Sequence, residues 1–187
     1  LCDGYRVTVS ADTAAMPLAD GVCLCLIDEV NDEHPIHGWH LVRLLAPGAD
    51  IGRIWSLSRA LTYRSVDRLV DRGFVTRDDH GDDRRRRLRP TAAGRGRARV
   101  WLDTPVEHVR YLRTGFLVAV ELRRRRGLDI AGFAARQLEA LSPALDGLIH
   151  DTATDADVDP VARWRHHSAE AARAFLIDMS QGHSPTS

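Results

Sequence analysis

Arginine side chains gather in two stretches near the middle of the chain. In the first, Arg59–Arg72, arginines alternate with aliphatic residues. The second is the run Arg84–Arg87, followed by Arg89. A guanidinium group presents a rigid fork of N–H donors that matches phosphate oxygens and the major-groove edge of guanine. The two stretches therefore indicate nucleic-acid contact, provided that the fold places them on one surface.

The first stretch has the pattern of a capped amphipathic helix. Ser58 is a typical N-cap and Gly73 a typical stop, which predicts a helix from Ser58 to about Arg72. At about 100° per residue, one side of this helix is a core stripe of Thr62, Val66, Leu69 and Val70. The opposite side mixes arginines with small apolar residues, which suits a DNA major groove. The DNA contacts expected from this helix are Ser58, Arg59, Ala60, Leu61, Tyr63, Arg64 and Arg68.

The second stretch has the pattern of the return strand of a hairpin. Phe74–Arg77 predicts a strand, Asp78–Asp83 a turn, and Arg84–Arg89 the strand that returns. An arginine run is often only a solvated surface, but on a hairpin that follows a candidate recognition helix it favours phosphate or minor-groove contact. The hairpin contacts expected with DNA are Arg84, Arg85, Arg86 and Arg87.

The order of the elements predicts a mainly α protein. Helices over about Leu18–Val30 and Ile36–Leu45 precede the Ser58 helix, and three helices followed by a two-stranded wing is the order of a winged helix-turn-helix. Four further helices are expected. Thr91 is expected to cap a helix over Ala92–Asp103, and a second helix runs from Val106 to Gly127. Asp129 caps a third helix, which extends to Ile149 and precedes an acidic linker at Asp151–Asp159. The last helix has Asp159 as its cap, begins at Pro160 and ends at Gly182, and its apolar stripe consists of Val161, Trp164, Ser168, Ala171, Ala172, Phe175, Leu176 and Met179. We therefore expect an N-terminal extension (1–15), a winged helix-turn-helix domain (16–104), an all-helical dimerisation domain (105–182) and a tail (183–187).

The formal net charge of +0 conceals an asymmetry along the chain. All 26 basic residues are arginine. Residues 34–126 hold 21 of them against 10 acidic residues, whereas 1–33 hold 1 against 7 and 127–187 hold 4 against 9. A basic middle segment favours a nucleic-acid partner. Cys2, Cys23 and Cys25 form no disulfide framework, and no apolar run reaches the roughly 20 residues of a membrane span, so we expect a cytoplasmic protein.

Four motifs, in order along the chain, carry a resemblance to a known family. They are His37-Gly38-Trp39-His40-Leu41; Ile54-Trp55 with Ser58, Tyr63, Arg64 and Gly73; Thr91-x-x-Gly94-Arg95; and Trp101-Leu102-x-x-Pro105. The chain resembles the PadR family of winged-helix transcriptional regulators, in the subgroup with a helical C-terminal domain. Thr62 departs from the larger aliphatic residue usual before Tyr63, and Arg87-Leu88 stand where tyrosines are common. The resemblance implies a homodimer that binds a palindromic operator, most often as a repressor, and that a small molecule or another signal releases.

The tryptophans and histidines of the chain could bind ligands, but each also has a structural explanation. A small aromatic effector would stack on Trp101 or, less directly, Trp39, although large apolar residues more often belong to the core. The spacing of His34, His37 and His40 does not predict a metal site, and His166-His167 are expected at the surface. No phosphate-binding loop or nucleophile elbow is present, so neither an enzyme nor a cofactor is expected. The alternatives are a winged-helix module that binds another protein and a MarR-like regulator.

Overall fold

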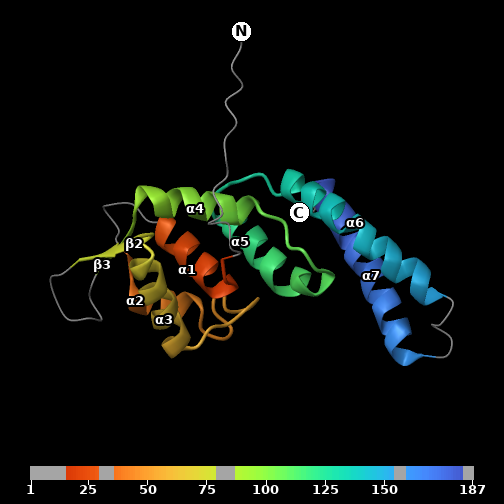
Figure 1. Cartoon of the computed structure of the whole chain (residues 1–187), viewed down its shortest axis with the longest axis horizontal. Helices are drawn as coiled ribbons and strands as arrows, with labels where there is room; N and C mark the ends of the chain where they lie inside the picture. The colour runs from red at the N-terminus through yellow and green to blue at the C-terminus, as the bar shows by residue number, and fades with distance from the viewer. Residues whose placement is uncertain (1–15, 30–35, 79–86, 154–158, 183–187) are drawn as a thin grey trace, which may run out of the picture.

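The computed structural model describes residues 16–29, 36–78, 87–153 and 159–182. Within them the chain is mainly helical, with one small antiparallel sheet (Figure 1). The elements are α1 (Leu18–Asp28), β1 (Ile36–His37), α2 (Gly38–Leu44), α3 (Arg59–Asp71), β2 (Val75–Arg77), β3 (Arg87–Pro90), α4 (Ala92–Asp103), a 3₁₀ turn η2 (Val109–Tyr111), a π-helical turn η3 (Leu112–Phe116), α5 (Leu117–Arg125), α6 (Ala131–Ala153) and α7 (Pro160–Ser180). The expected extension at 1–15 and tail at 183–187 lie outside the described residues.

Helix α1 is the centre of the N-terminal part. Every residue from Asp20 to Ile27 is buried, because α3, α4, α5 and β3 all pack against this helix. A helix that is apolar on all sides is stable only when it is enclosed in this way. Cys23 and Cys25 lie within it as free thiols, and burial raises the pKa of Cys23 to about 12. The two cysteines therefore serve apolar packing in the core.

The sheet has three strands in the order β1-β3-β2, whereas the sequence predicted a two-stranded wing. The added strand is β1, in which Ile36 pairs with Leu88 and His37 with Arg87. The sequence pattern predicted Ile36 in the second helix, but its side chain is buried in the core and α2 begins only at Gly38. Pairing with β3, over 50 residues away, overrides the local helical pattern, and periodicity alone does not reveal such pairing.

Two of the glycines in the motifs are sites of close approach between elements. A β-carbon at Gly38 would lie 2.7 Å from the ring of Tyr63, and one at Gly94 would lie 2.0 Å from the carbonyl oxygen of Phe74. The Thr91 hydroxyl accepts from the Gly94 N–H (3.0 Å) and donates to the carbonyl of Gly73 (2.8 Å). Thr91 and Gly94 therefore fix the start of α4 against the end of α3.

Helix α5 joins two apolar clusters. Val118 and Leu122 belong to the cluster around α1, whereas Ala119 belongs to the cluster formed with α6 and α7, against which Val120 also packs. The sequence predicted one helix from Val106, but regular helix begins at Leu117, after η2 and η3. The Gln137 side chain explains part of the difference, because its amide donates to the carbonyl of Val106 (2.9 Å) and accepts from the N–H of Val106 (2.8 Å). These bonds occupy backbone groups that a helix would need.

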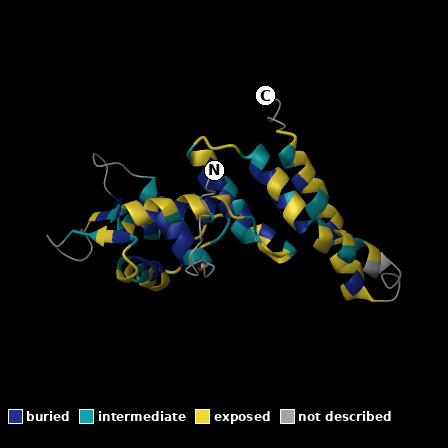
Figure 2. Cartoon of the chain, turned by 45° about the horizontal axis from the view of Figure 1, so that its top comes forward, coloured by how far each residue is buried: buried dark blue, intermediate teal, exposed yellow. Residues whose placement is uncertain are grey.

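Helices α6 and α7 form a long hairpin at one end of the molecule (Figure 1). The Asp159 carboxylate caps α7, as predicted, by accepting from Val161 N–H (3.0 Å) and Ala162 N–H (3.2 Å). The face of α7 buried against α6 contains Ala162, Ala169 and Leu176. Of the predicted stripe, Leu176 is buried in this face and Ala172 and Met179 pack against the same cluster, whereas Val161, Trp164 and Phe175 are exposed. Much of the hairpin surface is exposed (Figure 2). No helix in the described ranges has the length and apolar character required to cross a bilayer.

Candidate nucleic-acid interface

Helix α3 is held by one apolar face and by caps at both ends. The Ser58 hydroxyl accepts from Leu61 N–H (3.4 Å), and the Thr62 hydroxyl donates to the Ser58 carbonyl (3.0 Å). Thr62, Ser65, Val66 and Leu69 are buried, mainly against α1 and α2. Gly73 then adopts a left-handed conformation, with φ of 70°, and ends the helix. The predicted N-cap, core stripe and stop are confirmed, except that Val70 is half-buried and Ser65 joins the stripe.

The exposed side of α3 carries the residues that the sequence predicted for DNA contact. We define the outer face of α3 as Ser58, Arg59, Ala60, Leu61 and Arg64, all of which are exposed. The Leu61 side chain is 44% exposed although it is aliphatic. Within the described part of the chain, the Arg64 guanidinium group has neither a hydrogen-bond nor an ion-pair partner. An arginine without an internal partner can donate hydrogen bonds to base edges in a major groove, and the exposed aliphatic groups beside it can contact thymine methyls.

Arg68 has an intramolecular partner and does not belong to the outer face. Its guanidinium group donates two hydrogen bonds to the carboxylate of Asp20, from Nε (3.0 Å) and Nη2 (2.5 Å), and a third to the hydroxyl of Ser65 (3.0 Å). Asp20 lies in α1 and its side chain is 1% exposed. Arg68 thus links α3 to α1. Its orientation is explained by binding to a buried carboxylate, not by a contact with DNA.

Tyr63 lies between the core and the outer face. It is half-buried, its ring covers Gly38 at the start of α2, and the Arg59 guanidinium group lies 5.7 Å from the ring centroid. The ring therefore packs α2 against α3 and also orients Arg59. The expected contact of its hydroxyl with phosphate stays a prediction.

The wing consists of β2, β3 and the segment between them. Arg77 at the end of β2 binds Asp67 of α3 (2.6 Å), which fixes the base of the wing to the recognition-helix candidate. Arg87 is exposed at the start of β3. Arg84, Arg85 and Arg86 lie outside the described residues. Of the four predicted wing contacts, only Arg87 thus has a defined place, at the base of the hairpin.

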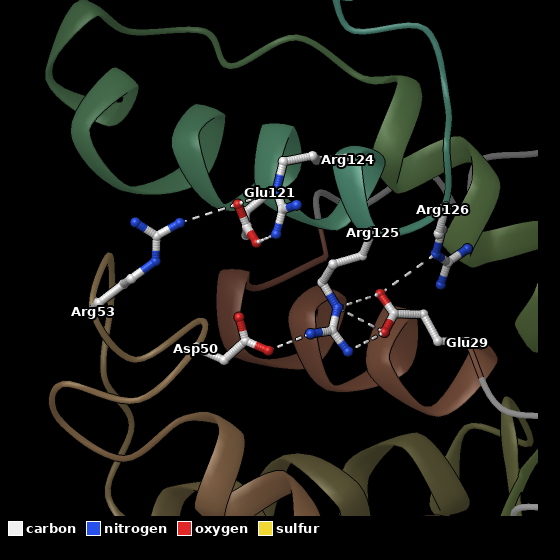
Figure 3. Close-up of polar contacts among 7 residues, drawn as sticks. All are labelled: Glu29, Asp50, Arg53, Glu121, Arg124, Arg125 and Arg126. Carbon is white, nitrogen blue, oxygen red and sulfur yellow. Dashed lines mark hydrogen bonds and ion pairs between the residues drawn. The ribbon is translucent and has the colours of Figure 1, made fainter. Parts of the chain in front are cut away.

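A network of ion pairs holds the segment that leads into α3 (Figure 3). Arg53, in the α2–α3 connection, binds Glu121 of α5 (3.2 Å), and Glu121 also accepts from Arg124 (2.6 Å). Arg125 binds Glu29 of α1 (2.7 Å) and also Asp50 of the same connection. Hydrogen bonding to Arg124 is the main cause that lowers the pKa of Glu121. The C-terminal end of α5 thus braces the α2–α3 connection from behind.

The same network neutralises part of the charge that the sequence assigned to the basic middle segment. Arg123, Arg124, Arg125 and Arg126 each bind a carboxylate of the chain, and the Arg126 partner Asp28 (3.0 Å) comes from the acidic N-terminal segment. Part of the positive charge of residues 34–126 is therefore balanced by internal ion pairs. Arg59 and Arg64 on the outer face of α3, and Arg87 of the wing, are exposed and take no part in these ion pairs.

The structure places the two tryptophans proposed for effector binding apart. Trp101 is half-buried against α1, where a β-carbon at Gly21 would lie 2.2 Å from its indole. It also lines a cavity of about 560 Å³ between α4 and the η2–η3 segment, together with Leu18, Val100, Val106, Tyr111 and Arg97. Trp39 lies on α2 at the surface, 39% exposed, and stacks on His40 (3.7 Å between ring centroids). Trp101 thus lines a cavity, and Trp39 does not share it.

Comparison with known proteins gives a likeness of structure. No protein-family model matches the sequence, and no curated protein matches it. Among solved structures, the chain is similar to Bacillus subtilis PadR in complex with operator DNA, with a TM-score of 0.39 and 14% sequence identity. The match covers 88% of this chain and 98% of that one.

Proposed function

We propose that this protein is a sequence-specific DNA-binding transcriptional regulator of the PadR type. The outer face of α3 is the observation that supports this proposal, because Arg64 and Leu61 are exposed on a helix whose opposite face packs against α1 and α2. In this proposal α3 enters the major groove, where Arg64 reaches base edges and Arg59 reaches base edges or phosphate. The wing, with Arg84 to Arg87, tracks the adjacent backbone.

The proposed regulator acts as a homodimer on a palindromic operator. The hairpin of α6 and α7 supports this, because Val161, Trp164 and Phe175 of α7 are 54%, 73% and 38% exposed. They recur on one side of the helix, and a second copy that covered them would remove much apolar surface from water. Two-fold symmetry would then present two α3 helices to successive major grooves. Occupancy of an operator by such a dimer makes repression the expected outcome.

The cavity beside Trp101 is the proposed site of a small aromatic effector. Trp101 and Tyr111 offer stacking faces and Arg97 a cation, and the cavity adjoins η3, the π-helical turn that leads into α5. A ligand there would act on α5, whose far end braces the α2–α3 connection. Quenching of intrinsic fluorescence by aromatic acids, present in the natural chain and absent in Trp101→Leu, would support this site. Quenching that persists in the variant would rule it out.

The proposed function is tested by selecting bound duplexes from a random DNA pool with the full chain. We expect enrichment of one palindrome whose half-sites lie about one helical turn apart, or a multiple of it. Binding to the selected duplex should exceed binding to a scrambled duplex by about 10³-fold or more. Uniform, salt-sensitive binding without enrichment would contradict sequence-specific regulation. Absence of DNA binding would favour the protein-interaction module.

A further inference from the structure

The C-terminal hairpin holds a cluster of metal-ligating side chains that DNA binding does not use. His166, His167 and Glu170 lie on α7, and one candidate ligand atom from each lies within 4.8 Å of the others. The Glu170 carboxylate is central. Its Oε2 is 3.5 Å from Nε2 of His166 and 3.3 Å from Nδ1 of His167. The three residues occupy positions i, i+1 and i+4, so the two histidines approach one carboxylate from adjacent sides of a single helical turn.

The second nitrogen of His166 is fixed by the neighbouring helix. Its Nδ1 lies 3.0 Å from the carbonyl oxygen of Ile149 in α6. A carbonyl only accepts, so Nδ1 carries a proton, and in the neutral ring Nε2 is left with a lone pair. A carbonyl bonded to one imidazole nitrogen while the other is free is the usual outer support of a metal-ligating histidine.

In this arrangement the lone pair of His166 Nε2 faces the carboxylate of Glu170. With His166 neutral, its Nε2 and the Glu170 oxygen both present lone pairs to the space between them. A cation placed there, either a proton on Nε2 or a metal ion, turns the repulsion into attraction. A tetrahedral ion with bonds of about 2.1 Å keeps its ligand atoms about 3.4 Å apart. The two His–Glu separations of 3.5 and 3.3 Å already match that edge.

We propose that His166, His167 and Glu170 bind a divalent transition-metal cation of the zinc class. Two imidazoles and one carboxylate form a borderline ligand set that suits Zn²⁺, whereas Mg²⁺ and Ca²⁺ prefer oxygen ligands alone. The side chain of His166 is 18% exposed and those of His167 and Glu170 are 67% and 52% exposed, so the remaining coordination position faces water. The ion would clamp one turn of α7 and, through the bond from His166 to Ile149, hold that turn to α6.

Isothermal titration of the full chain with Zn²⁺ tests this proposal independently of DNA binding. We expect saturable binding of one equivalent per chain, no comparable signal with Mg²⁺, and a rise in the unfolding temperature with Zn²⁺. The variants His167→Ala and Glu170→Gln change exposed side chains, so the fold is retained while the affinity falls by about tenfold or more. The matched control His108→Ala, at an exposed histidine before η2, should leave the affinity unchanged. Absence of Zn²⁺ binding, or binding that His167→Ala and Glu170→Gln leave intact, would overturn the proposal.

Discussion

At the residue scale, the sequence predicted that Arg68 contacts DNA, whereas the structure pairs it with a buried carboxylate. Helical phase places it beside Arg64, yet its guanidinium group binds Asp20, whose side chain is 1% exposed. A carboxylate removed from water needs such a partner, because an unpaired buried charge is costly. We infer that Arg68 contributes to the stability of the α1–α3 pair and that Arg64 contributes to recognition.

Arg68→Ala should therefore destabilise the chain by about 3 kcal/mol, the low end of the range for breaking a buried ion pair, because the Arg68 side chain is itself 42% exposed. Urea unfolding followed by circular dichroism measures this change. The control is Arg72→Ala, which removes an exposed arginine from the C-terminal end of the same helix. Equal stability of the two variants would show that the pair with Asp20 contributes little.

Glycines in helices give a second prediction at this scale. A β-carbon at Gly21 would lie 2.2 Å from the indole of Trp101, so Gly21→Ala should cost about 1–3 kcal/mol from overpacking. A β-carbon at Gly96 in α4 would meet no atom within 4 Å, so Gly96→Ala should stabilise the helix by about 0.5–1 kcal/mol. Thermal unfolding of both variants separates the two effects. A gain in stability for Gly21→Ala would contradict the packing of Trp101 on α1.

At the element scale, local chemistry in the sequence was enough to place most helix ends. Ser58, Thr91 and Asp159 cap their helices as predicted, and Gly73 and Gly127 end theirs, because capping depends on neighbours within a few residues. The failures share a different cause. Ile36 pairs with Leu88, and Val106 is bonded by Gln137, 31 residues away. Such partners leave no trace in periodicity, and neither does the ion pair of Arg68 with Asp20.

The brace between α5 and the α2–α3 connection gives a pH-dependent prediction. Arg124 hydrogen bonding, with further attraction from Arg53, lowers the pKa of Glu121 in the folded chain. A lowered acid pKa stabilises the folded state above the unfolded-state pKa, and this stability is lost as pH falls through the folded value. Glu121→Gln should therefore reduce the free energy of unfolding at pH 7.

The difference between Glu121→Gln and the natural chain should shrink as acid protonates Glu121. Urea unfolding at a series of pH values from 7 downward measures it. Glu139→Gln, at an exposed glutamate of α6, is the control for loss of a carboxylate outside the network. A destabilisation by Glu121→Gln that is independent of pH would contradict the ionic character of the brace.

At the scale of the whole molecule, the exposed side of α7 requires a partner if the protein is a two-fold regulator. The sequence predicted an apolar stripe on α7, but of that stripe only Leu176 is fully buried, beside Ala162 and Ala169. Trp164, 73% exposed, is the most exposed of the large apolar side chains on this helix. We expect Trp164→Ala to shift the chain from dimer to monomer in sedimentation equilibrium.

The matched control for Trp164→Ala is Trp39→Ala, since Trp39 is also exposed but lies on α2, far from the hairpin along the chain. The control should leave the dimer intact. A natural chain that is monomeric at all concentrations, or a dimer that survives Trp164→Ala unchanged, would place the interface elsewhere or remove it. Either result would also remove the geometric basis for a palindromic operator.

The affinity of Arg64→Ala for the selected duplex, measured against the natural chain by fluorescence anisotropy, tests the central claim most directly. If Arg64 on the outer face of α3 reads a base, the variant should lose about 1–3 kcal/mol of binding free energy and discriminate less at one position of each half-site. Arg113→Ala is the control, because it removes the same charge from an exposed position of η3. A recognition role for α3 predicts a large loss for Arg64→Ala and almost none for Arg113→Ala. Equal affinities of the two variants would contradict it.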